Sequence, residues 1–436
     1  MYNKQQTTQA FTKKQKEEDI LYSSKIKTAE QKKQKIFQQA KIARINARHR
    51  MFTEWSIEPT PSWTVECEMM FNELPKKVIK SDSIKIEDVG FKGKVLYYDK
   101  KIENISIKNP PVLLQLTKDV SCVICKTVHD QTLMEMVGEE EKAMKENNND
   151  TLIIVSTDQI LACLMSAVHS KYSWHLTIEK KGKKIIIDKE DDSIIDLLTV
   201  NENSIYAPTQ DNENKTNNLQ ALGYEAIKIN EKFRKQVLIK NDIAEQHGNV
   251  SFKNKQSKTQ DVLYRYRKVY LPPLIHSTNK TNCILLTRGE IHAKNKGSNN
   301  SYIYVCTLNE YILKSHKNWR SQIENQKGAL LANEIKNNTC KLHKFICQAL
   351  LSSCEDIKLG FVSRKSANDP ENHNILSIQS YKTKDLGSQI GLKEENVWGI
   401  LRFIIDNISD RPDAKYVVLK DPLKPLLRLY CTHDAV

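Results

Sequence analysis

Residues 156–187 read STDQILACLMSAVHSKYSWHLTIEKKGKKIII, and this stretch decides the fold. It opens with Ser156-Thr157-Asp158, residue types that begin helices. Apolar residues at helical spacing follow, namely Ile160, Leu161, Leu164, Met165 and Val168. The period then changes to two: Trp174, Leu176 and Ile178 alternate with polar residues before a Lys181-Gly182 turn and the returning run Lys184-Ile185-Ile186-Ile187. We therefore predict a helix followed by a β-hairpin that packs after it.

Outward from this stretch, helical and strand patterns mix without a repeating period, and parallel βαβ alternation is not evident. This mixture predicts an α+β fold. Two β-rich runs, residues 282–287 and 302–307, flank a polar turn and predict a hairpin. The other expected elements are an apolar run over 328–335, a buried helix over 342–351, an amphipathic helix over 396–408, and terminal strands around 416–419 and 426–430.

The chain has 436 residues and a formal net charge of +14, which is concentrated at its beginning. Residues 1–50 hold 13 Lys or Arg against 4 Asp or Glu, a net charge of +9. Residues 13–50 contain no Pro or Gly and carry spaced apolar residues. They predict a long, weakly amphipathic basic helix or, alternatively, a solvated and partly disordered tail. Such a segment favours a polyanionic partner, either RNA phosphates or an acidic protein face.

Two prolines, Pro59 and Pro61, end any helix and open an extended entry into the next unit. We therefore predict a basic, largely helical or partly disordered segment over 1–57 and one large domain over 58–436. No run approaches the roughly 18 uncharged apolar residues of a membrane helix, and the first residues lack a signal-peptide apolar region. We expect a soluble, cytoplasmic protein with no membrane contact.

The ten cysteines lie scattered among apolar residues, which is typical of reduced thiols used as small hydrophobes. One pair, Cys122 and Cys125, has metal-like spacing, with His129 nearby. A structural zinc ion needs four ligands, and the sequence has no second pair of this spacing. We therefore expect strand residues here, and neither a metal nor another cofactor in the chain.

Nine collinear motifs over about 360 residues carry a family resemblance. They are Trp63-Thr-Val-Glu-Cys-Glu-Met69, Tyr97-Tyr-Asp-Lys100, Tyr172-Ser-Trp174, Asp196-Leu-Leu-Thr-Val200, Tyr264-Arg-Tyr-Arg267, Glu334-Ile-Lys-Asn-Asn338, Lys358-Leu-Gly-Phe-Val-Ser-Arg364, Trp398-Gly-Ile-Leu-Arg402 and Leu419-Lys-Asp-Pro422. In this order they resemble the subunit of eukaryotic translation initiation factor 3 that is designated D. The resemblance covers that family's cap-binding domain and, loosely, its basic helical segment.

The resemblance implies a domain similar to that of decapping exoribonucleases, a cup of two mixed β-sheets flanked by helices. It also implies recognition of the mRNA cap by Asp158, Tyr172 and Asn230, with Lys171 beside them. These residue types suit the task, because an aromatic ring stacks on the cationic 7-methylguanine and a carboxylate accepts its N–H donors. Three neighbouring positions depart from the family's usual residues, which affects affinity or nucleotide preference. They are Lys171, Ile227 and Glu231.

Each cap-face residue has another interpretation. Asp158 stands where a helix-capping carboxylate would stand. Tyr172 opens a strand, and buried aromatic residues more often belong to a core than to a ligand platform. Asn230 would by itself be a surface residue of a helix.

Residues 194–208 match the family's RNA gate, a loop proposed to control access of the 5′ end. The gate positions are Ile194, Asp196, Leu197, Thr199, Asn201, Glu202 and Pro208. The alternative is an ordinary polar loop, since long loops inside a compact domain are common at functional sites without being diagnostic of them.

The rival function is that of a nuclease. Decapping exoribonucleases hold divalent ions with a Glu-x-Asp motif followed by Glu-x-Lys. Glu334-Ile-Lys336 fits the second motif, and Glu290-Ile-His292 resembles the first with His in place of Asp. Gln348 falls where those enzymes have a Gln. Loss of the carboxylate weakens a site for hard cations, so we expect these positions to be vestigial and Glu334 to form a structural ion pair with Lys336.

The function implied is that of a non-enzymatic cap-binding subunit that promotes translation initiation of selected mRNAs. The expected partners are the capped 5′ end of mRNA, the other subunits of initiation factor 3 with the one designated E first among them, and the small ribosomal subunit. Two alternatives remain: a metal-dependent decapping nuclease, and a scaffold subunit that binds no RNA.

Overall fold

The computed structural model divides into two compact units, Met1–Met51 and Phe52–Val436. The structure describes residues 54–115, 123–147, 150–208, 216–249, 261–297, 301–311 and 318–433. The basic helix predicted over 13–50 lies outside these ranges. In the second unit, Trp55 and Ile57 already pack against buried strand residues near the C-terminus. Packing therefore begins upstream of the boundary that the two prolines predicted.

Mixed β-structure runs through the second unit. The described strands are β1 (Thr64–Met70), β2 (Lys85–Tyr98), β3 (Thr151–Thr157), β4 (His175–Lys181), β5 (Lys184–Asp188), β6 (Leu238–Gln246), β7 (Leu263–Leu271), β8 (Asn282–Ile291), β9 (Ala293–Lys294), β10 (Tyr302–Asn309), β11 (Asp356–Arg364), β12 (His373–Lys382), β13 (Ala414–Lys420) and β14 (Leu426–Cys431). Their order is β1-β14-β13-β4-β5-β3-β8-β7-β2-β9-β10-β11-β12, and β6 pairs with β2.

The long strand β2 joins two sheets. It runs antiparallel to β7, whereas among the described residues only the pair Tyr97 and Lys294 links it to β9. Both sheets are mixed, because β3 lies parallel to β5 and β8 in the larger sheet and β10 lies parallel to β11 in the smaller one. This confirms the α+β class and the two mixed sheets that the resemblance implied.

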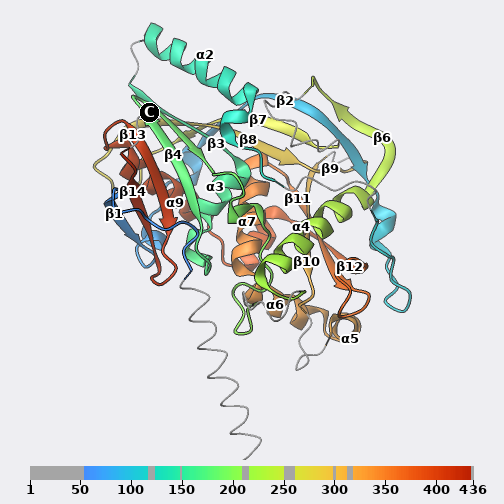
Figure 1. The fold of residues 1–436 in the computed structure, drawn as a ribbon. Helices are drawn as coiled ribbons and strands as arrows, with labels where there is room; N and C mark the ends of the chain where they lie inside the picture. The colour runs from blue at the N-terminus through green and yellow to red at the C-terminus, as the bar shows by residue number, and fades with distance from the viewer. Residues whose placement is uncertain are drawn as a thin grey trace, which may run out of the picture. The chain divides into compact units, whose positions relative to one another are not determined.

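Helices cover the sheets (Figure 1). They are α2 (Gln131–Asn147), α3 (Asp158–Met165), α4 (Leu219–Gln236), α5 (Trp319–Asn325), α6 (Lys327–Asn337), α7 (Thr339–Ser352), α8 (Thr383–Gln389) and α9 (Glu394–Ser409). Helix α3 contacts α7, α7 contacts β8 of the larger sheet, and α4 contacts β10 of the smaller sheet. Among the described helices, none is long and apolar enough to cross a membrane.

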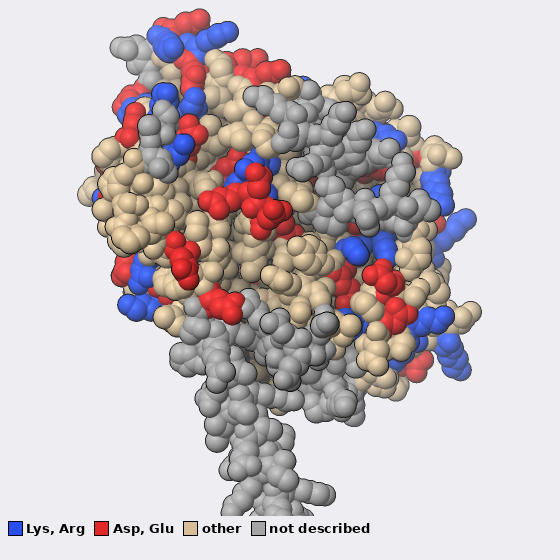
Figure 2. Space-filling view, in the orientation of Figure 1, with Lys and Arg blue, Asp and Glu red and all other residues tan. Residues whose placement is uncertain are grey.

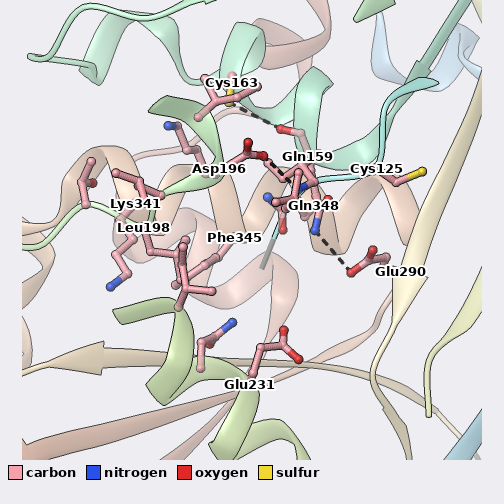
Figure 3. A pocket seen from close by; sticks show the side chains of 18 of the residues that line it. Cys125, Gln159, Cys163, Asp196, Leu198, Glu231, Glu290, Lys341, Phe345 and Gln348 are labelled. Atoms are coloured by element: carbon pink, nitrogen blue, oxygen red, sulfur yellow. Dashed lines mark hydrogen bonds between the residues drawn. The ribbon is translucent and has the colours of Figure 1, made fainter. Parts of the chain in front are cut away.

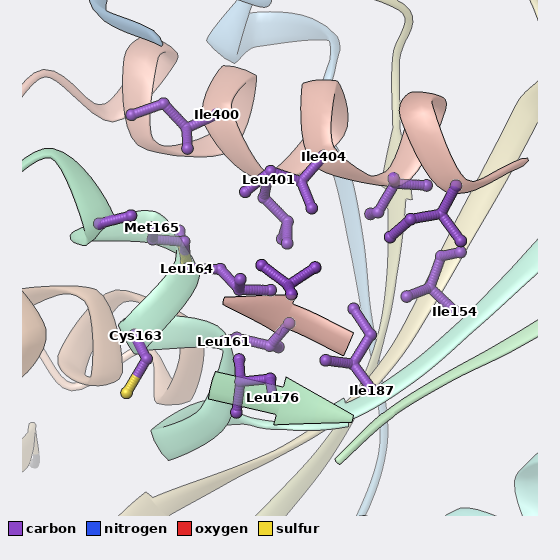
Figure 4. Packing of buried hydrophobic residues seen from close by; sticks show 14 of the residues in the cluster. Ile154, Leu161, Cys163, Leu164, Met165, Leu176, Ile187, Ile400, Leu401 and Ile404 are labelled. Carbon is purple, nitrogen blue, oxygen red and sulfur yellow. The ribbon is translucent and has the colours of Figure 1, made fainter. Parts of the chain in front are cut away.

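The stretch quoted first forms the core of the larger sheet. Helix α3 and the β4–β5 hairpin are confirmed, and Gly182 makes the turn with a φ of +57°. Leu161 and Leu164 of α3 are completely buried between the strands and α9 (Figure 4). Burial of such a side chain contributes about 1.5–3 kcal/mol to the free energy of folding. This apolar layer therefore holds α3 in place against the sheet.

One predicted pairing is wrong. Strand β8 does not form a hairpin with β10, since it lies between β3 and β7, and the short β9 pairs with β10 instead. The reason is burial: all but the first residue of β8 is buried, as a central strand requires. The helices expected over 342–351 and 396–408 are confirmed as α7 and α9, and the last two strands as β13 and β14.

Candidate functional site

A polar pocket of about 110 Å³ lies where α3, α4 and α7 meet residues 195–199 (Figure 3). Helix α3 contributes Gln159, α4 contributes Asn230 and Arg234, and α7 contributes Lys341 and Gln348. Glu290 of β8 and the half-buried Cys125 also line it, whereas Cys122 lies outside the described ranges. The pocket thus brings together part of the predicted gate, one predicted cap residue and two of the nuclease-like positions.

Asp158 lies beneath this pocket and does not line it. Its side chain is fully buried, and its two oxygens accept hydrogen bonds from the backbone N–H groups of Gln159, at 2.9 Å, and Glu290, at 3.0 Å. Burial and then the charge of Glu290 raise the pKa of the Asp158 carboxyl. The carboxylate therefore fastens the start of α3 to β8, whereas the N-cap residue of α3 is Thr157.

Glu290 lines the pocket among cationic and amide groups. Its carboxylate lies 4.0 Å from both Arg234 and Arg288, and Gln159 Nε2 donates to it at 3.4 Å. Burial acts to raise the pKa of Glu290, but the nearby His292 ring, with Nε2 at 3.7 Å, and the two guanidinium groups lower it below the ordinary value. Glu290 is thus a charged carboxylate that protein cations balance.

His292, which stands in place of the expected Asp, is held by the smaller sheet. Its Nδ1 accepts a hydrogen bond from Val305 N at 3.0 Å, and its ring centroid lies 4.5 Å from that of Tyr304. Burial and the nearby Arg234 lower the pKa of His292 to about 4, so the ring is neutral at pH 7. Gln348 Oε1 accepts a hydrogen bond from the Tyr304 hydroxyl.

Glu334 and Lys336 lie elsewhere, in a second cavity of about 270 Å³. They belong to helix α6, where residues two apart point to opposite sides, whereas on a strand they would share a face. Glu334 is buried and accepts a hydrogen bond from Asn338 Nδ2 at 2.9 Å, while Lys336 is exposed. The ion pair expected between them does not form. Over the described ranges, no three His, Cys, Asp or Glu side chains come together to hold a metal ion.

Tyr172 lines a small adjoining cavity of about 20 Å³ and is only 6% exposed. Leu197 and Leu198 line both this cavity and the pocket of Asn230. The neighbouring Lys171 is exposed. The ring of Tyr172 is therefore covered in this conformation, as the core interpretation of this residue predicts.

Asn230 is buried and not the surface residue that helix position alone suggested. Its Oδ1 accepts a hydrogen bond from Thr307 Oγ1 of β10 at 3.3 Å. Ile227 and Glu231, which depart from the family's usual residues, line the same pocket. Glu231 pairs with Arg234 at 3.0 Å, one turn along α4.

Glu202 holds the predicted gate against the loop that precedes β4. Its Oε1 accepts hydrogen bonds from Lys171 N at 2.7 Å and Tyr172 N at 3.3 Å, and its Oε2 accepts one from Thr199 Oγ1 at 2.9 Å. The side chain is 1% exposed. Hydrogen bonds to a buried charged group contribute about 1.5–3 kcal/mol each, so Glu202 is the strongest single anchor of residues 194–208.

Two further anchors hold the same segment. Asn201, at a φ of +50°, exchanges two hydrogen bonds with Asn338: its backbone N–H donates to Oδ1 at 2.9 Å, and its Oδ1 accepts from Nδ2 at 3.0 Å. Asp196 pairs with the buried Lys189 at 2.9 Å, and also accepts a hydrogen bond from Ile124 N at 2.8 Å. Hydrogen bonds and an ion pair therefore hold residues 194–208 at Asp196 and again at Asn201. Pro208 is the last residue described before the gap at 209–215.

The cations of the pocket were not predicted. Lys341 and Lys344 are three residues apart on α7, and Arg234 faces them from α4. The signal in the sequence was a pair of lysines inside the largely apolar run 340–351, CKLHKFICQALL, where one helix face is expected to be buried.

The fold and the pocket define an α+β protein with a polar pocket lined by helices. Residues 194–208, which are hydrogen-bonded to residues distant in the sequence, cover this pocket. A family model described as Eukaryotic translation initiation factor 3 subunit 7 matches residues 1–431. The chain belongs to that family, which confirms the resemblance carried by the nine motifs.

Curated relatives agree, and those compared here carry the name of the initiation factor 3 subunit designated D. The relative from Nasonia vitripennis is 37% identical over 387 residues, covering 87% of this chain and 65% of that protein. The relative of the same name from Pyricularia oryzae is 36% identical, with 86% and 65% covered. The chain thus spans somewhat less than two thirds of the length of these relatives.

Among solved structures, Rai1 of Scheffersomyces stipitis in complex with (3′-NADP)+ and calcium ion aligns with a TM-score of 0.46 and 12% identity, over 86% of this chain and 93% of that one. Rai1 of S. pombe aligns with a TM-score of 0.45 and 12% identity, over 84% and 99% of the two chains.

Proposed function

We propose that the chain acts in eukaryotic translation initiation by binding the capped 5′ end of mRNA between α3, α4 and α7. The family to which it belongs supports a role in initiation. The observation that carries the binding proposal is the meeting of Asn230 and the 194–208 segment at one polar pocket, although they lie on separate elements. Amide, carboxylate and cationic groups there offer both the donors and the acceptors that a nucleotide requires.

Binding of a whole cap requires the gate segment to move. The pocket measures about 110 Å³, below the roughly 300 Å³ at which pockets for drug-sized ligands begin. Tyr172 lies in the adjoining cavity behind Leu197 and Leu198. Displacement of these two leucines would join the cavities and expose the Tyr172 ring beside Asn230. In this proposal, the hydrogen bonds of Glu202 and Asn201 set the free-energy cost of opening.

We propose binding without hydrolysis. The carboxylate of Glu290 is balanced by Arg234 and Arg288, and Glu334 belongs to another cavity. A two-metal hydrolytic site needs several carboxylates directed at one point. The donor set around this pocket, with its neutral His292, does not supply them.

Cap-analogue competition tests the proposal. The purified full chain is cross-linked to 5′-capped RNA with and without magnesium, 7-methylguanosine cap analogue competes, and RNA length is followed in parallel. The proposal predicts competition by the methylated analogue and RNA of unchanged length. Shortened RNA would establish the nuclease alternative, and cross-linking that is insensitive to the analogue would favour a scaffold.

A matched pair of tyrosine variants sharpens this test. Tyr172→Leu keeps apolar packing but removes the aromatic face, and should abolish cap-sensitive cross-linking. Tyr224→Leu changes a tyrosine of α4 that is 59% exposed and lines neither the pocket nor the Tyr172 cavity, and should have no effect. Equal loss in both variants would contradict a specific role for Tyr172.

We further propose, from the membership of this family, that the chain assembles with other subunits of initiation factor 3 and with the small ribosomal subunit in the cytoplasm. The subunit designated E is the first partner to test. Co-sedimentation of the full chain with small ribosomal subunits, with and without that partner, measures both contacts, and failure to co-sediment under either condition would contradict this part.

A further inference from the structure

Lys341 is a buried cation that no group of the described residues neutralises directly. It lies in the first turn of α7, is 2% exposed and lines the pocket. In the part of the chain that the structure describes, its Nζ has no hydrogen-bond partner. Its nearest aromatic neighbour is the ring of Phe345, with the centroid 5.9 Å from Nζ. A buried ammonium without a partner carries a substantial desolvation cost.

The other charges around the pocket are already paired. Arg234 bonds to Glu231 at 3.0 Å and lies 4.0 Å from Glu290. Asp196 pairs with Lys189, which lies behind the pocket wall. Lys344, one turn after Lys341, lines the same wall. Among the described residues, Lys341 is therefore the pocket-lining cation that has no hydrogen-bond partner.

We propose that Lys341 is the anchor of a phosphate subsite in this pocket, which binds a phosphate group of the nucleotide 5′ end. The proposal deepens the proposed cap-binding function and rests on it for the identity of the RNA. A phosphate group presents several acceptor oxygens, which match the three N–H donors of an ammonium. The cavity of about 110 Å³ accommodates a phosphate group without displacement of the gate.

The surroundings fit an anion of this size. The side-chain amides of Gln159, Asn230 and Gln348 also line the pocket, and each carries N–H donors. Burial lowers the pKa of Lys341 to about 8, although Cys306 and Glu334 act to raise it, so the ammonium is still charged at pH 7. A bound phosphate would offset the desolvation of this charge.

This subsite is local and is not part of a broad basic surface. On the face shown in Figure 2, Lys and Arg side chains are interspersed with Asp and Glu. Recognition of phosphate by the buried Lys341 would depend less on long-range attraction than recognition by a surface patch, which predicts weak dependence on salt.

Titration of the full chain with inorganic pyrophosphate tests the subsite without RNA. Wild type should bind, and Lys341→Met should reduce affinity at least about tenfold, as expected for loss of a charge-assisted hydrogen bond. Lys341→Arg should retain part of the binding. The matched control is Lys384→Met, which changes an exposed lysine of α8 and should bind as wild type does. Equal binding by wild type and Lys341→Met would overturn the proposal, as would absence of binding to wild type.

Thermal unfolding separates this role from misfolding. Because Lys341→Met removes an unpaired buried charge, its Tm should equal or exceed that of wild type. A variant that loses pyrophosphate binding with an unchanged or higher Tm supports the subsite. A clearly lower Tm would mean that Lys341 supports the fold, and Lys341→Arg would then decide. Binding of pyrophosphate retained in part or in full by a stable Lys341→Arg variant supports the subsite, and complete loss of binding in that variant overturns it.

Capped RNA and 7-methylguanosine nucleoside distinguish the source of the phosphate. Lys341→Met should weaken binding of capped RNA at least about tenfold and leave binding of the nucleoside unaffected. If wild type binds pyrophosphate but not capped RNA, the cap proposal fails and the subsite stands for a free anion. If capped RNA binds wild type and Lys341→Met equally, the cap proposal stands and the subsite is wrong.

Discussion

Residues 156–187 and residues 194–208 are neighbours in sequence, yet different interactions hold them. The first stretch is fixed by apolar side chains of α3, β4 and β5 that pack against the sheet and α9 (Figure 4). The second stretch contributes Ile195 to the same cluster and Val200 to a small separate one. It is held in addition by polar side chains that bond to distant segments: Glu202 to the loop before β4, and Asn201 to Asn338 at the junction of α6 and α7.

This difference separates a permanent structure from one that can open. Apolar packing is cooperative with the whole core, so loss of it unfolds the unit. A segment held by a few hydrogen bonds and two buried apolar side chains, Ile195 and Val200, can detach at a lower cost than the core, which remains folded. Changes in the first stretch should therefore lower global stability, and changes in the second should lower local stability.

The largest effect is expected for Leu164→Ala. Leu164 is completely buried in the layer between α3 and α9, and truncation of such a leucine costs about 2–5 kcal/mol. Chemical denaturation of the full chain measures the loss. Ile205→Ala is the matched control in the second stretch, where the side chain is 62% exposed, and should change stability by less than about 0.5 kcal/mol. Similar losses in both variants would contradict the comparison.

The second effect is a pH dependence of the unfolding free energy, which arises from Glu334, the hydrogen-bond partner of Asn338. Burial raises the pKa of Glu334, which bonds to Asn338, from 4.5 to about 7. A carboxyl with a raised pKa in the folded state contributes stability below its unfolded pKa, and this contribution is lost as the pH rises toward 7. Glu334→Gln should remove up to about 3 kcal/mol of this dependence, since one pKa unit equals about 1.4 kcal/mol.

Unfolding free energies of wild type and Glu334→Gln between pH 4 and pH 8 measure the effect. The variant should be the more stable protein at pH 8, and the two curves should approach each other toward pH 4. Glu324→Gln, in α5, serves as the control. A difference between wild type and Glu334→Gln that is constant with pH would show that Glu334 titrates normally.

Segments held by apolar packing were easier to predict from the sequence than segments held by hydrogen bonds to distant residues. The spacing of apolar residues predicted α3, the β4–β5 hairpin, α7 and α9. In each case only one type of element, a helix or a strand, places all the apolar residues of the pattern on one buried side. The pairing of β8 with β10 was wrong because pairing depends on burial of both faces of β8, which no local period records.

The site was predictable in type and less so in position. The resemblance indicated Asn230 and the gate segment, and both line the pocket. It could not indicate that Asp158 lies beneath the pocket with its oxygens taken by backbone N–H groups. The spacing of Glu334 and Lys336 matched the Glu-x-Lys motif, but on helix α6 residues two apart point to opposite sides. Lys341 was missed because burial depends on tertiary packing.

A third effect, smaller and local, is expected for Glu202→Ala. Loss of the buried acceptor releases the N–H groups of Lys171 and Tyr172 and the hydroxyl of Thr199, which should destabilise the closed gate by about 2 kcal/mol. Hydrogen exchange should accelerate at residues 194–204 and remain slow in α3. Equal acceleration in both stretches would mean that the gate and the core open as one unit.

The same variant connects the gate to binding. If the gate covers Tyr172, a weaker closed state raises the population that accepts a cap, and Glu202→Ala should bind capped RNA more tightly than wild type. Binding of pyrophosphate should change little, because the phosphate subsite does not require displacement of residues 197–199. Weaker binding of both ligands would indicate that Glu202 shapes the pocket and does not close it.

The smallest effect isolates backbone conformation in the gate. Asn201 has a φ of +50° and bonds to Asn338 through its side chain. Asn201→Gly and Asn201→Ala both lose that hydrogen bond, but only alanine has a Cβ that disfavours the left-handed region. Hydrogen exchange at residues 194–204 measures the free energy of opening. In the alanine variant this free energy should be about 1 kcal/mol lower than in the glycine variant. If the two variants exchange alike, movement of the segment relieves the strain at Asn201, and backbone conformation at this residue does not affect how tightly the gate is closed.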